Sequence, residues 1–463
     1  MTINKKTFRR YEPDQTYLFP PDIREWLPED HLAYFISDTV DELDLSRIYE
    51  RYCPAPGYPP YDPKMMTKLL TYAYCIGMRS SRQIARATKE NIGFRVLAAN
   101  NYPDFRTICR FRVDHSDAFR FLFRQVLHLC VVKGIARLKI AALDGTKVKA
   151  NANTRKNAGK TDFRKELDEL DRIAKQTMEE AEKIDDEEND RFGDDDGNPL
   201  PPELRQREGR RKRIAECLKQ IKDEEDHRET EFNKMVEDRI RKETEQAVKG
   251  KKLRGRKPKF RKETKPISRN PSDPDSRLMI SSNGFVQGYN AQAMVDCESQ
   301  IIIAENVVQD CNDEQQLKPM LDEVRGNFGK VPKKLLADSG YFCTAVVKEI
   351  KDTDLYVATH SSYDVRQGVP LGKKKRKPTV RDYMAAKLKT EKGHAIFSQR
   401  GRTVECVFGQ TKENRGFRRF HLRGLNKVRG EWTLQCIGHN LHKLWLRTIH
   451  SLNISLKKRP SQT

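Results

Sequence analysis

The stretch Lys139-Ile140-Ala141-Ala142-Leu143-Asp144-Gly145-Thr146-Lys147-Val148 reads as a short strand that carries a carboxylate. A continuous apolar run bounded by a turn signal is typical of a strand buried on both faces, so we expect Asp144 to end the strand and Gly145 to turn the chain. An ionised carboxylate is costly to bury unless a partner pairs with it. Either a cation sits beside Asp144, or the strand ends at the surface and Asp144 caps a turn.

The composition indicates a polyanionic partner. The 463 residues include 89 Lys and Arg against 67 Asp and Glu, a net charge of +22. Such an excess favours nucleic acid, because neutralising phosphates releases condensed counterions; a merely soluble basic protein is the alternative. The ten cysteines include no C-x-x-C pair, which indicates reduced thiols in a cytosolic protein. The sequence also shows no apolar window of membrane-spanning length, and residues 1–10 do not resemble a signal peptide.

Residues 1–135 predict a helical domain that binds DNA. Helices are expected at about 32–43, 63–76, 81–88, 92–99 and 104–132, with Asp62 as an N-cap before Pro63. Short helices joined by tight turns, with exposed arginines, fit a helix-turn-helix-like reader of DNA. A helical bundle that packs on the next domain fits nearly as well.

Residues 161–265 predict an inserted, highly charged helical hairpin. Apolar positions recur at helical spacing on both sides of a Gly- and Pro-containing break at 193–202, which predicts two antiparallel helices with a narrow apolar seam. The segment ends in a dense basic run, 251–265. This run is either a solvated linker or a contact to the phosphate backbone, and its density favours DNA.

The first strand pattern returns later in the chain. Strands are predicted at 284–296 and 301–308, followed by a helix at about 313–325. Residues 333–338 then form another short apolar strand that ends in Asp338 before Ser-Gly. A further strand is expected at 355–359, and a last helical region from about residue 400 carries Glu405 and Lys412 two turns apart on nearly one face.

Two aspartates at strand ends and a glutamate on a later helix can converge. Three such carboxylates repel one another unless divalent cations bind them. Hard oxygen ligands suit Mg²⁺ or Mn²⁺. Two such ions can activate a water or a 3′-hydroxyl and stabilise the leaving oxygen in phosphoryl transfer. Each acid alone has an ordinary explanation as a turn or helix-end residue, but those explanations do not account for the set.

The order of elements resembles an RNase H-like fold, and the motifs resemble those of DDE-type transposases encoded by bacterial insertion sequences. In that family the first Asp ends the first strand, the second follows the fourth strand, and the Glu lies on a late helix. Asp144, Asp338 and Glu405 occupy those places. A related subgroup has a Tyr–Arg–Glu–Lys signature, with Lys seven residues after Glu. Lys412 matches it, Phe397 stands near the Tyr position, and Arg400 and Arg402 bracket the Arg position.

Further segments carry the resemblance. They are Asp273-Pro274-Asp275-Ser276-Arg277, Gly288-Tyr289-Asn290, Gly416-Phe417-Arg418-Arg419-Phe420 and the helical region 63–114. The resemblance covers about residues 15–160 and 270–445.

The resemblance implies a DNA transposase that cuts at the inverted-repeat ends of its own element and joins them to target DNA. It implies Asp144, Asp338 and Glu405 as the catalytic residues and as ligands of two Mg²⁺ (or Mn²⁺) ions. The DNA contacts expected from it are Arg400, Arg402, Lys412, Arg415, Arg418 and Arg419. The partners are double-stranded DNA and, for synapsis of two ends, a second copy in a homodimer. The expected location is the bacterial cytoplasm, on the nucleoid when DNA is bound.

The predicted fold class is an α/β RNase H-like catalytic core, a mixed sheet flanked by helices, with an all-α N-terminal domain and an inserted helical hairpin. The domains are 1–135 (helical, DNA-binding), 136–160 plus 266–445 (catalytic), 161–265 (hairpin with basic linker) and 446–463 (C-terminal tail). Two functional alternatives stay open: a catalytically inactive DNA-binding protein derived from a transposase, and an RNase H-like nuclease without joining activity.

Overall fold

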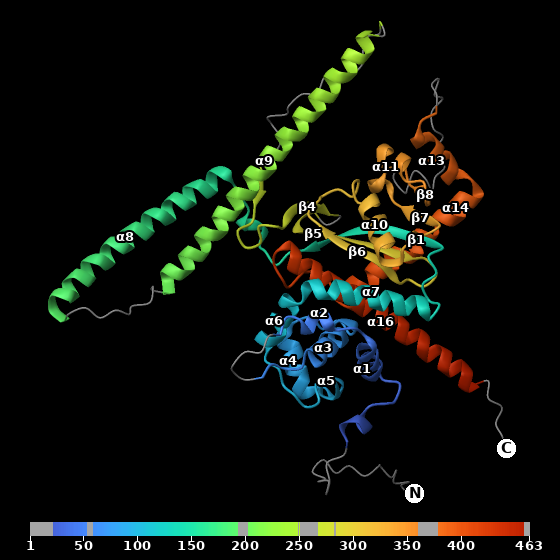
Figure 1. Ribbon diagram of the computed structural model, residues 1–463, viewed down its shortest axis with the longest axis horizontal. Helices are drawn as coiled ribbons and strands as arrows, with labels where there is room; N and C mark the ends of the chain where they lie inside the picture. The colour runs from blue at the N-terminus through green and yellow to red at the C-terminus, as the bar shows by residue number, and fades with distance from the viewer. Residues whose placement is uncertain are drawn as a thin grey trace, which may run out of the picture.

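The computed structural model describes residues 22–52, 59–192, 202–248, 250, 267–281, 284–359 and 378–457. The basic run at 251–265 and the basic residues 373–377 lie outside the described residues. The described chain consists of a helical region, a mixed sheet with helices against it, and a projecting arm of two long helices (Figure 1).

The N-terminal region is helical, as the sequence predicts. Its elements are η1 (Ile23–Trp26), α1 (Leu32–Glu42), α2 (Ser46–Tyr49), α3 (Pro63–Cys75), α4 (Ser81–Glu90), α5 (Ile92–Leu97), α6 (Phe105–Asp114) and α7 (Ser116–Val132). The Asp62 side chain caps α3 by accepting a hydrogen bond from the backbone N–H of Lys64. The single helix predicted over 104–132 is wrong, because the chain leaves helical geometry at His115, whose ring packs against Tyr52 and Phe111.

The main sheet joins segments that are far apart in sequence. Its strands are β1 (Ile140–Lys149), β4 (Arg277–Ser281), β5 (Gly284–Asp296), β6 (Ile302–Val308), β7 (Lys334–Ala337) and β8 (Asp354–Val357), in the order β4-β5-β1-β7-β8, with β6 also paired to β5. β1 runs antiparallel to β5 and parallel to β7, which is itself parallel to β8. Two short strands, β2 (Ala158–Gly159) and β3 (Ser268–Arg269), form a separate pair.

Asp144 does not end its strand. β1 continues through Gly145 as far as Lys149, and it stays paired with β5 along this length, with Asp144 opposite Ala293. The predicted turn at Gly145 is therefore wrong. Glycine leaves room there for neighbouring side chains: a Cβ atom would lie 2.3 Å from Gln292 Nε2 and 2.7 Å from Asp313 Oδ1, so these side chains would have to move.

One continuous hydrophobic core links the helical region to the sheet. The long C-terminal helix α16 (Leu425–Lys457) packs against α3, α7 and β6, and the buried Trp432 lies on it. α10 (Leu317–Phe328) packs against β6. The remaining helices near the other end of the sheet are α11 (Thr344–Glu349), α13 (Val380–Lys389) and α14 (Glu391–Phe397) (Figure 1). α16 runs well beyond residue 445, where a tail was predicted to begin.

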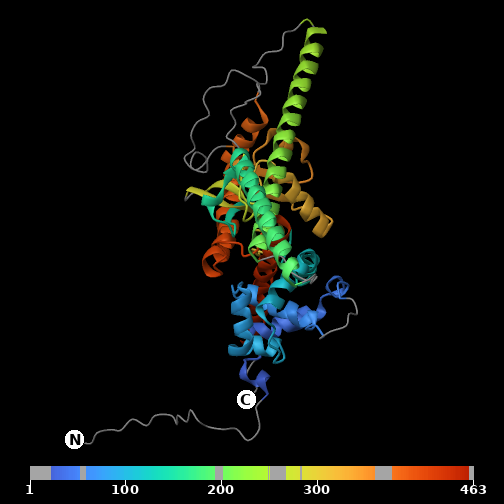
Figure 2. The ribbon, with the colours of Figure 1, turned by 90° about the vertical axis from the view of Figure 1, so that its left-hand side faces the viewer.

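α8 (Lys160–Phe192) and α9 (Pro202–Val248) form the arm. Phe163 of α8 packs against Ile214, Cys217 and Ile221 of α9 in a small cluster separate from the main core. The base of the arm is tied to the sheet region by an ion pair between Glu224 and the buried Arg269. α9 then continues past the body as a single helix (Figures 1 and 2).

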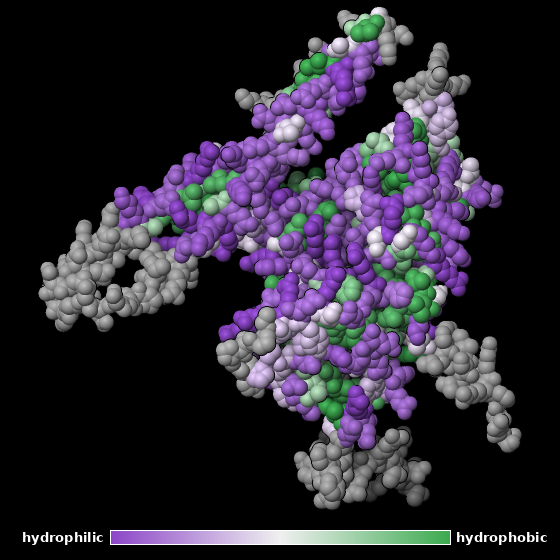
Figure 3. Space-filling view, in the orientation of Figure 1, coloured by the Kyte–Doolittle hydropathy of each residue, from purple (hydrophilic) through white to green (hydrophobic). Residues whose placement is uncertain are grey.

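The surface of the arm is mostly hydrophilic, as is much of the face in Figure 3. In the part of the chain that the structure describes, there is no helix with the length and apolar character needed to span a membrane.

Candidate active site

The guanidinium of Arg400 lies among the three carboxylates singled out by the sequence. Its Nη1 is 3.3 Å from Asp144 Oδ2 and 3.6 Å from Glu405 Oε1, and its Nη2 is 3.9 Å from Asp338 Oδ2. The Arg400 side chain is 11% exposed, so this charge is largely withdrawn from water. The structure therefore brings Asp144, Asp338 and Glu405 to one place.

Strand register places the two aspartates side by side. β1 and β7 are parallel neighbours, with Leu143 opposite Ala337, and the residue that follows each of these is an aspartate. Asp338 follows β7 directly and caps the short helix η3 (Ser339–Tyr341), with Oδ1 accepting from Gly340 N at 2.9 Å. The side chains of Asp144 and Asp338 are 18% and 32% exposed.

Glu405 and Lys412 lie on one irregular helix. The π-helical turn η4 (Gly401–Glu405) leads into α15 (Cys406–Gly409), and a second π-helical turn, η5 (Gln410–Asn414), follows. π-helical turns are rare and occur frequently at functional sites. The Glu405 side chain is 59% exposed, so it forms the open side of the cluster.

Burial controls the charge of the two aspartates. It raises the pKa of Asp144 to about 6, against the opposing effect of Arg400, and the nearby Asp338 raises that pKa further. Burial also raises the pKa of Asp338, again opposed by Arg400. Ionised carboxylates in such a site need positive charge beside them. Of the two interpretations of Asp144, the structure supports the one in which a cation lies beside it, and that cation is Arg400.

Two family models match the chain. One, a transposase domain of the DUF772 family, covers residues 21–114, and the other, a transposase DDE domain, covers residues 365–445. Both matches are to transposase domains, and together they support a DDE transposase of the insertion-sequence kind. Glu405, Arg400 and Lys412 lie within the second match, whereas Asp144 and Asp338 lie outside both. No curated protein and no solved structure matches the chain.

DDE transposases generally use divalent metal ions. The donor set of this transposase fits such an ion in kind, because it consists of hard carboxylate oxygens. Within the described residues, no three Asp, Glu, His or Cys side chains stand close enough together to hold a metal ion. Arg400 lies between the carboxylates instead and supplies positive charge to all three.

A fourth acid, Asp313, lies beside the transposase site and was not singled out from the sequence. Its Oδ1 accepts hydrogen bonds from Asn290 Nδ2 at 2.6 Å and from Gln292 Nε2 at 2.7 Å, and it lies 3.4 Å from Lys147 Nζ. Its charge helps to raise the pKa of Asp144 and of Asp338. The sequence signal was the pair Asn290 and Gln292, two polar residues that lie on one face of β5 and are themselves fully buried.

The residues predicted to contact DNA occupy different environments. Arg402 and Arg419 are exposed, and Arg418 is exposed while paired with Glu413. Lys412 is half-buried near Asp144; burial lowers its pKa, and the Asp144 charge opposes that shift.

Arg415 is buried, in contrast to the other predicted contacts. Its Nε donates to the backbone carbonyl of Cys75 at 3.2 Å. This position suits a link between the catalytic region and α3 better than a contact to DNA. The structure also distinguishes Arg400 from Arg402, the two arginines that bracket the family's Arg position. Of these two, Arg400 contacts the carboxylates, and Arg402 is exposed.

Proposed function

We propose that this transposase cuts DNA at the ends of its own insertion sequence and joins the freed 3′ ends to target DNA. The observation that carries the proposal is the contact of one buried guanidinium, Arg400, with three carboxylates from three separate segments of the chain. An acidic cluster whose charge is balanced by one guanidinium would accept cations and a phosphate if that guanidinium turned away.

The strand order supports an RNase H-like catalytic core. Leaving aside β2, β3 and β4, the five strands in chain order are β1, β5, β6, β7 and β8, and they lie in the sheet as third, second, first, fourth, fifth. The first three are antiparallel neighbours and the last two run parallel to the first. Asp144 then lies on the first strand and Asp338 directly after the fourth, which are the family's positions. We interpret the arm, α8 with α9, as a helical hairpin inserted after the first strand.

Asp144, Asp338 and Glu405 would hold two Mg²⁺ or Mn²⁺ ions only after Arg400 leaves the space between them and the carboxylates move closer together. When bound, such ions would lower the pKa of the attacking water or 3′-hydroxyl and would neutralise charge on the leaving oxygen. The half-buried Asp144 and Asp338 would fix one side of the site, since β1 and β7 are hydrogen-bonded on both edges within the sheet. The more exposed Glu405 leaves the opposite side open for DNA.

Basic side chains around the cluster would hold the DNA. Arg400 would exchange its carboxylate partners for a phosphate oxygen, and Lys412 would contact the same phosphate from the next turns of the helix. Arg402, Arg418 and Arg419 would extend the contact along the backbone. Two element ends have to be brought together, so we propose that the transposase acts as a homodimer, in the bacterial cytoplasm and on the nucleoid when DNA is bound.

The test uses the full-length protein with duplex DNA that carries the sequences flanking its own coding region. With Mg²⁺ or Mn²⁺ we expect nicking at the element ends and joined products with a second duplex, both lost on removal of the metal. Asp144→Asn, Asp338→Asn and Glu405→Gln should each abolish both products. Glu391→Gln, an exposed acid on α14, is the matched control and should leave them intact.

Each outcome separates the alternatives. Cleavage without joined products indicates an RNase H-like nuclease, and DNA binding without either product indicates an inactive derivative. Full cleavage by the Asp144→Asn variant would mean that the site assignment is wrong, whatever the family of the chain.

A further inference from the structure

A basic hollow lies next to the C-terminal end of β1, away from the acidic site. It has a volume of about 500 Å³ and is lined by Asn151, Ala152, Asn153, Thr154, Lys156, Ser272, Arg419 and Arg423. Its lining thus combines three basic side chains with two hydroxyls and two amides, and no lining residue is acidic. These are the groups that proteins use to hold phosphate oxygens.

The walls of the hollow are held by hydrogen bonds between segments that are distant in sequence. Arg423 Nε donates to the carbonyl of Asn151 at 2.9 Å, and Asn151 Nδ2 donates to the carbonyl of His421 at 2.8 Å. On the other side, Asn270 Nδ2 donates to the carbonyl of Asn153 at 2.8 Å. The backbone that carries the basic groups is therefore organised before any ligand arrives, which lowers the entropy cost of binding.

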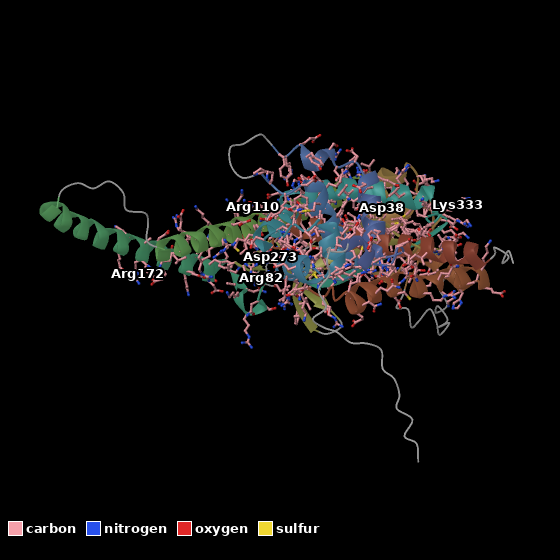
Figure 4. The ribbon with its side chains drawn as sticks, turned by 90° about the horizontal axis from the view of Figure 1, so that it is seen from below. Asp38, Arg82, Arg110, Arg172, Asp273 and Lys333 are labelled. Carbon is pink, nitrogen blue, oxygen red and sulfur yellow. The ribbon has the colours of Figure 1, made fainter. Side chains whose placement is uncertain are left out.

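Buried groups support the same walls from below. Asp273, with no exposed surface, accepts from the Tyr289 hydroxyl at 2.7 Å and from Gly424 N at 3.0 Å, which fixes the loop before α16. Figure 4 shows Asp273 where the arm meets the body, with Arg172 farther out along the arm. Oδ1 of Asp273 is thus occupied beneath the hollow, whereas its buried Oδ2 has no hydrogen-bond partner. Within the described residues, Lys156, Arg419 and Arg423 form no ion pair.

Strand β1 connects the hollow to the acidic site. The N–H of Lys149 donates to the Arg418 carbonyl at 3.2 Å, and the N–H of Phe420 donates to the Lys149 carbonyl at 2.8 Å, so Arg419 is held beside the end of β1. Asp144 lies five residues earlier on the same strand. At about 3.3 Å per residue the separation is roughly 17 Å.

We propose that this hollow, with Lys156, Arg419 and Arg423, binds a backbone phosphate of the DNA whose cleaved phosphate lies at the acidic site. The inference rests on the proposed function and adds a second anchoring point to it. Phosphates on one strand of B-form DNA advance about 3.4 Å along the axis and also rotate around it, so a straight-line separation of roughly 17 Å is reached within about five nucleotides. The site reads position and not sequence, because phosphates carry no base information.

The experiment compares the full chain with the double variant Lys156→Gln/Arg423→Gln by titrating a 30-base-pair duplex of the element end at several salt concentrations without metal. Removing one basic group from a phosphate should lower the slope of log K against log salt by about 1, so we expect a decrease of about 1 to 2 for the double variant. Affinity at moderate salt should fall about tenfold. Lys348→Gln/Lys351→Gln, which removes the same charge from exposed residues by α11, should change the slope little.

Position is tested with a neutral methylphosphonate placed in turn at each phosphate within about five nucleotides of the cleavage site. This substitution should weaken binding by the unaltered chain and have little effect on the double variant, whereas at distant positions it should affect both equally. Equal slopes for the double variant and the control overturn the hollow as a phosphate site. A wild-type chain that fails to bind the duplex at all overturns the proposed function too, which distinguishes the two failures.

Discussion

Replacing Gly145 by alanine should destabilise this protein although it adds only one methyl group. The new Cβ would lie 2.3 Å from Gln292 Nε2, 2.7 Å from Asp313 Oδ1 and 3.0 Å from Asn290 Oδ1. All three atoms belong to one network, in which Asn290 and Gln292 both donate to Asp313 and both are fully buried. The methyl group can be accommodated only by moving these side chains.

The magnitude follows from two opposing effects. Overpacking a tightly filled site costs about 1 to 3 kcal/mol, and breaking one hydrogen bond to the charged Asp313 costs about 1.5 to 3 kcal/mol. The reduced freedom of the unfolded chain offsets about 0.4 to 1 kcal/mol of this. We therefore expect the free energy of unfolding to fall by about 1.5 to 5.5 kcal/mol.

Urea unfolding in metal-free buffer measures this change. Tryptophan fluorescence is a suitable signal, because Nε1 of the buried Trp432 donates to the Gln292 carbonyl at 3.2 Å. Gly326→Ala is the matched control: no heavy atom lies within 4 Å of its added Cβ on α10, so it should stabilise the protein by about 0.5 to 1 kcal/mol. If Gly145→Ala behaves like Gly326→Ala, the packing argument around Asp144 is wrong.

Three further predictions concern buried charge. Burial raises the pKa of Glu305 from 4.5 to about 7, so the stabilising contribution of Glu305 is complete below pH 4.5 and is lost as the pH rises through 7. In urea titrations, the free energy of unfolding of Glu305→Gln should exceed that of the wild type by about 3 kcal/mol at pH 8 and by little at pH 4. An equal difference at both pH values would contradict this prediction. Burial lowers the pKa of His439 to about 3, and its Nε2–H donates to the Gln300 carbonyl, so the stabilising contribution of the neutral ring is present above pH 6.5 and is lost as the pH falls toward 3. Between pH 7 and pH 4, the free energy of unfolding of His439→Gln should fall by about 3 kcal/mol less than that of the wild type in the same titrations. Parallel pH profiles for the two proteins would refute the assignment. Arg79 Nη1 donates to the Arg419 carbonyl, and the Arg79 guanidinium covers the Phe417 ring. Arg79→Met should therefore lower the free energy of unfolding by about 2 to 4 kcal/mol, and Arg79→Lys should be about as unstable, because lysine lacks the planar guanidinium. Wild-type stability in the lysine variant would show that charge alone matters.

Local chemistry in the sequence was enough for several features. Asp62 caps α3, the apolar run before Asp338 is a strand, and the strand predicted over 284–296 has these bounds in β5. Each of these depends on the residues themselves and their near neighbours, through capping, turn geometry and apolar alternation. The three candidate acids were likewise recognisable. Each one alone could be a turn or helix-end residue, but that explanation does not account for the three together.

Tertiary structure decided what those local rules cannot reach. Gly145 looks like a turn residue, yet β5 pairs with β1 past it and Asp313 needs the space of its missing side chain. Arg400 and Arg402 are equivalent by sequence, but only Arg400 turns inward to the acids, on a helix whose π-helical turn departs from regular spacing. Which polar groups share one buried volume depends on the register of distant strands and on close packing, and neither is encoded in any single stretch of the chain.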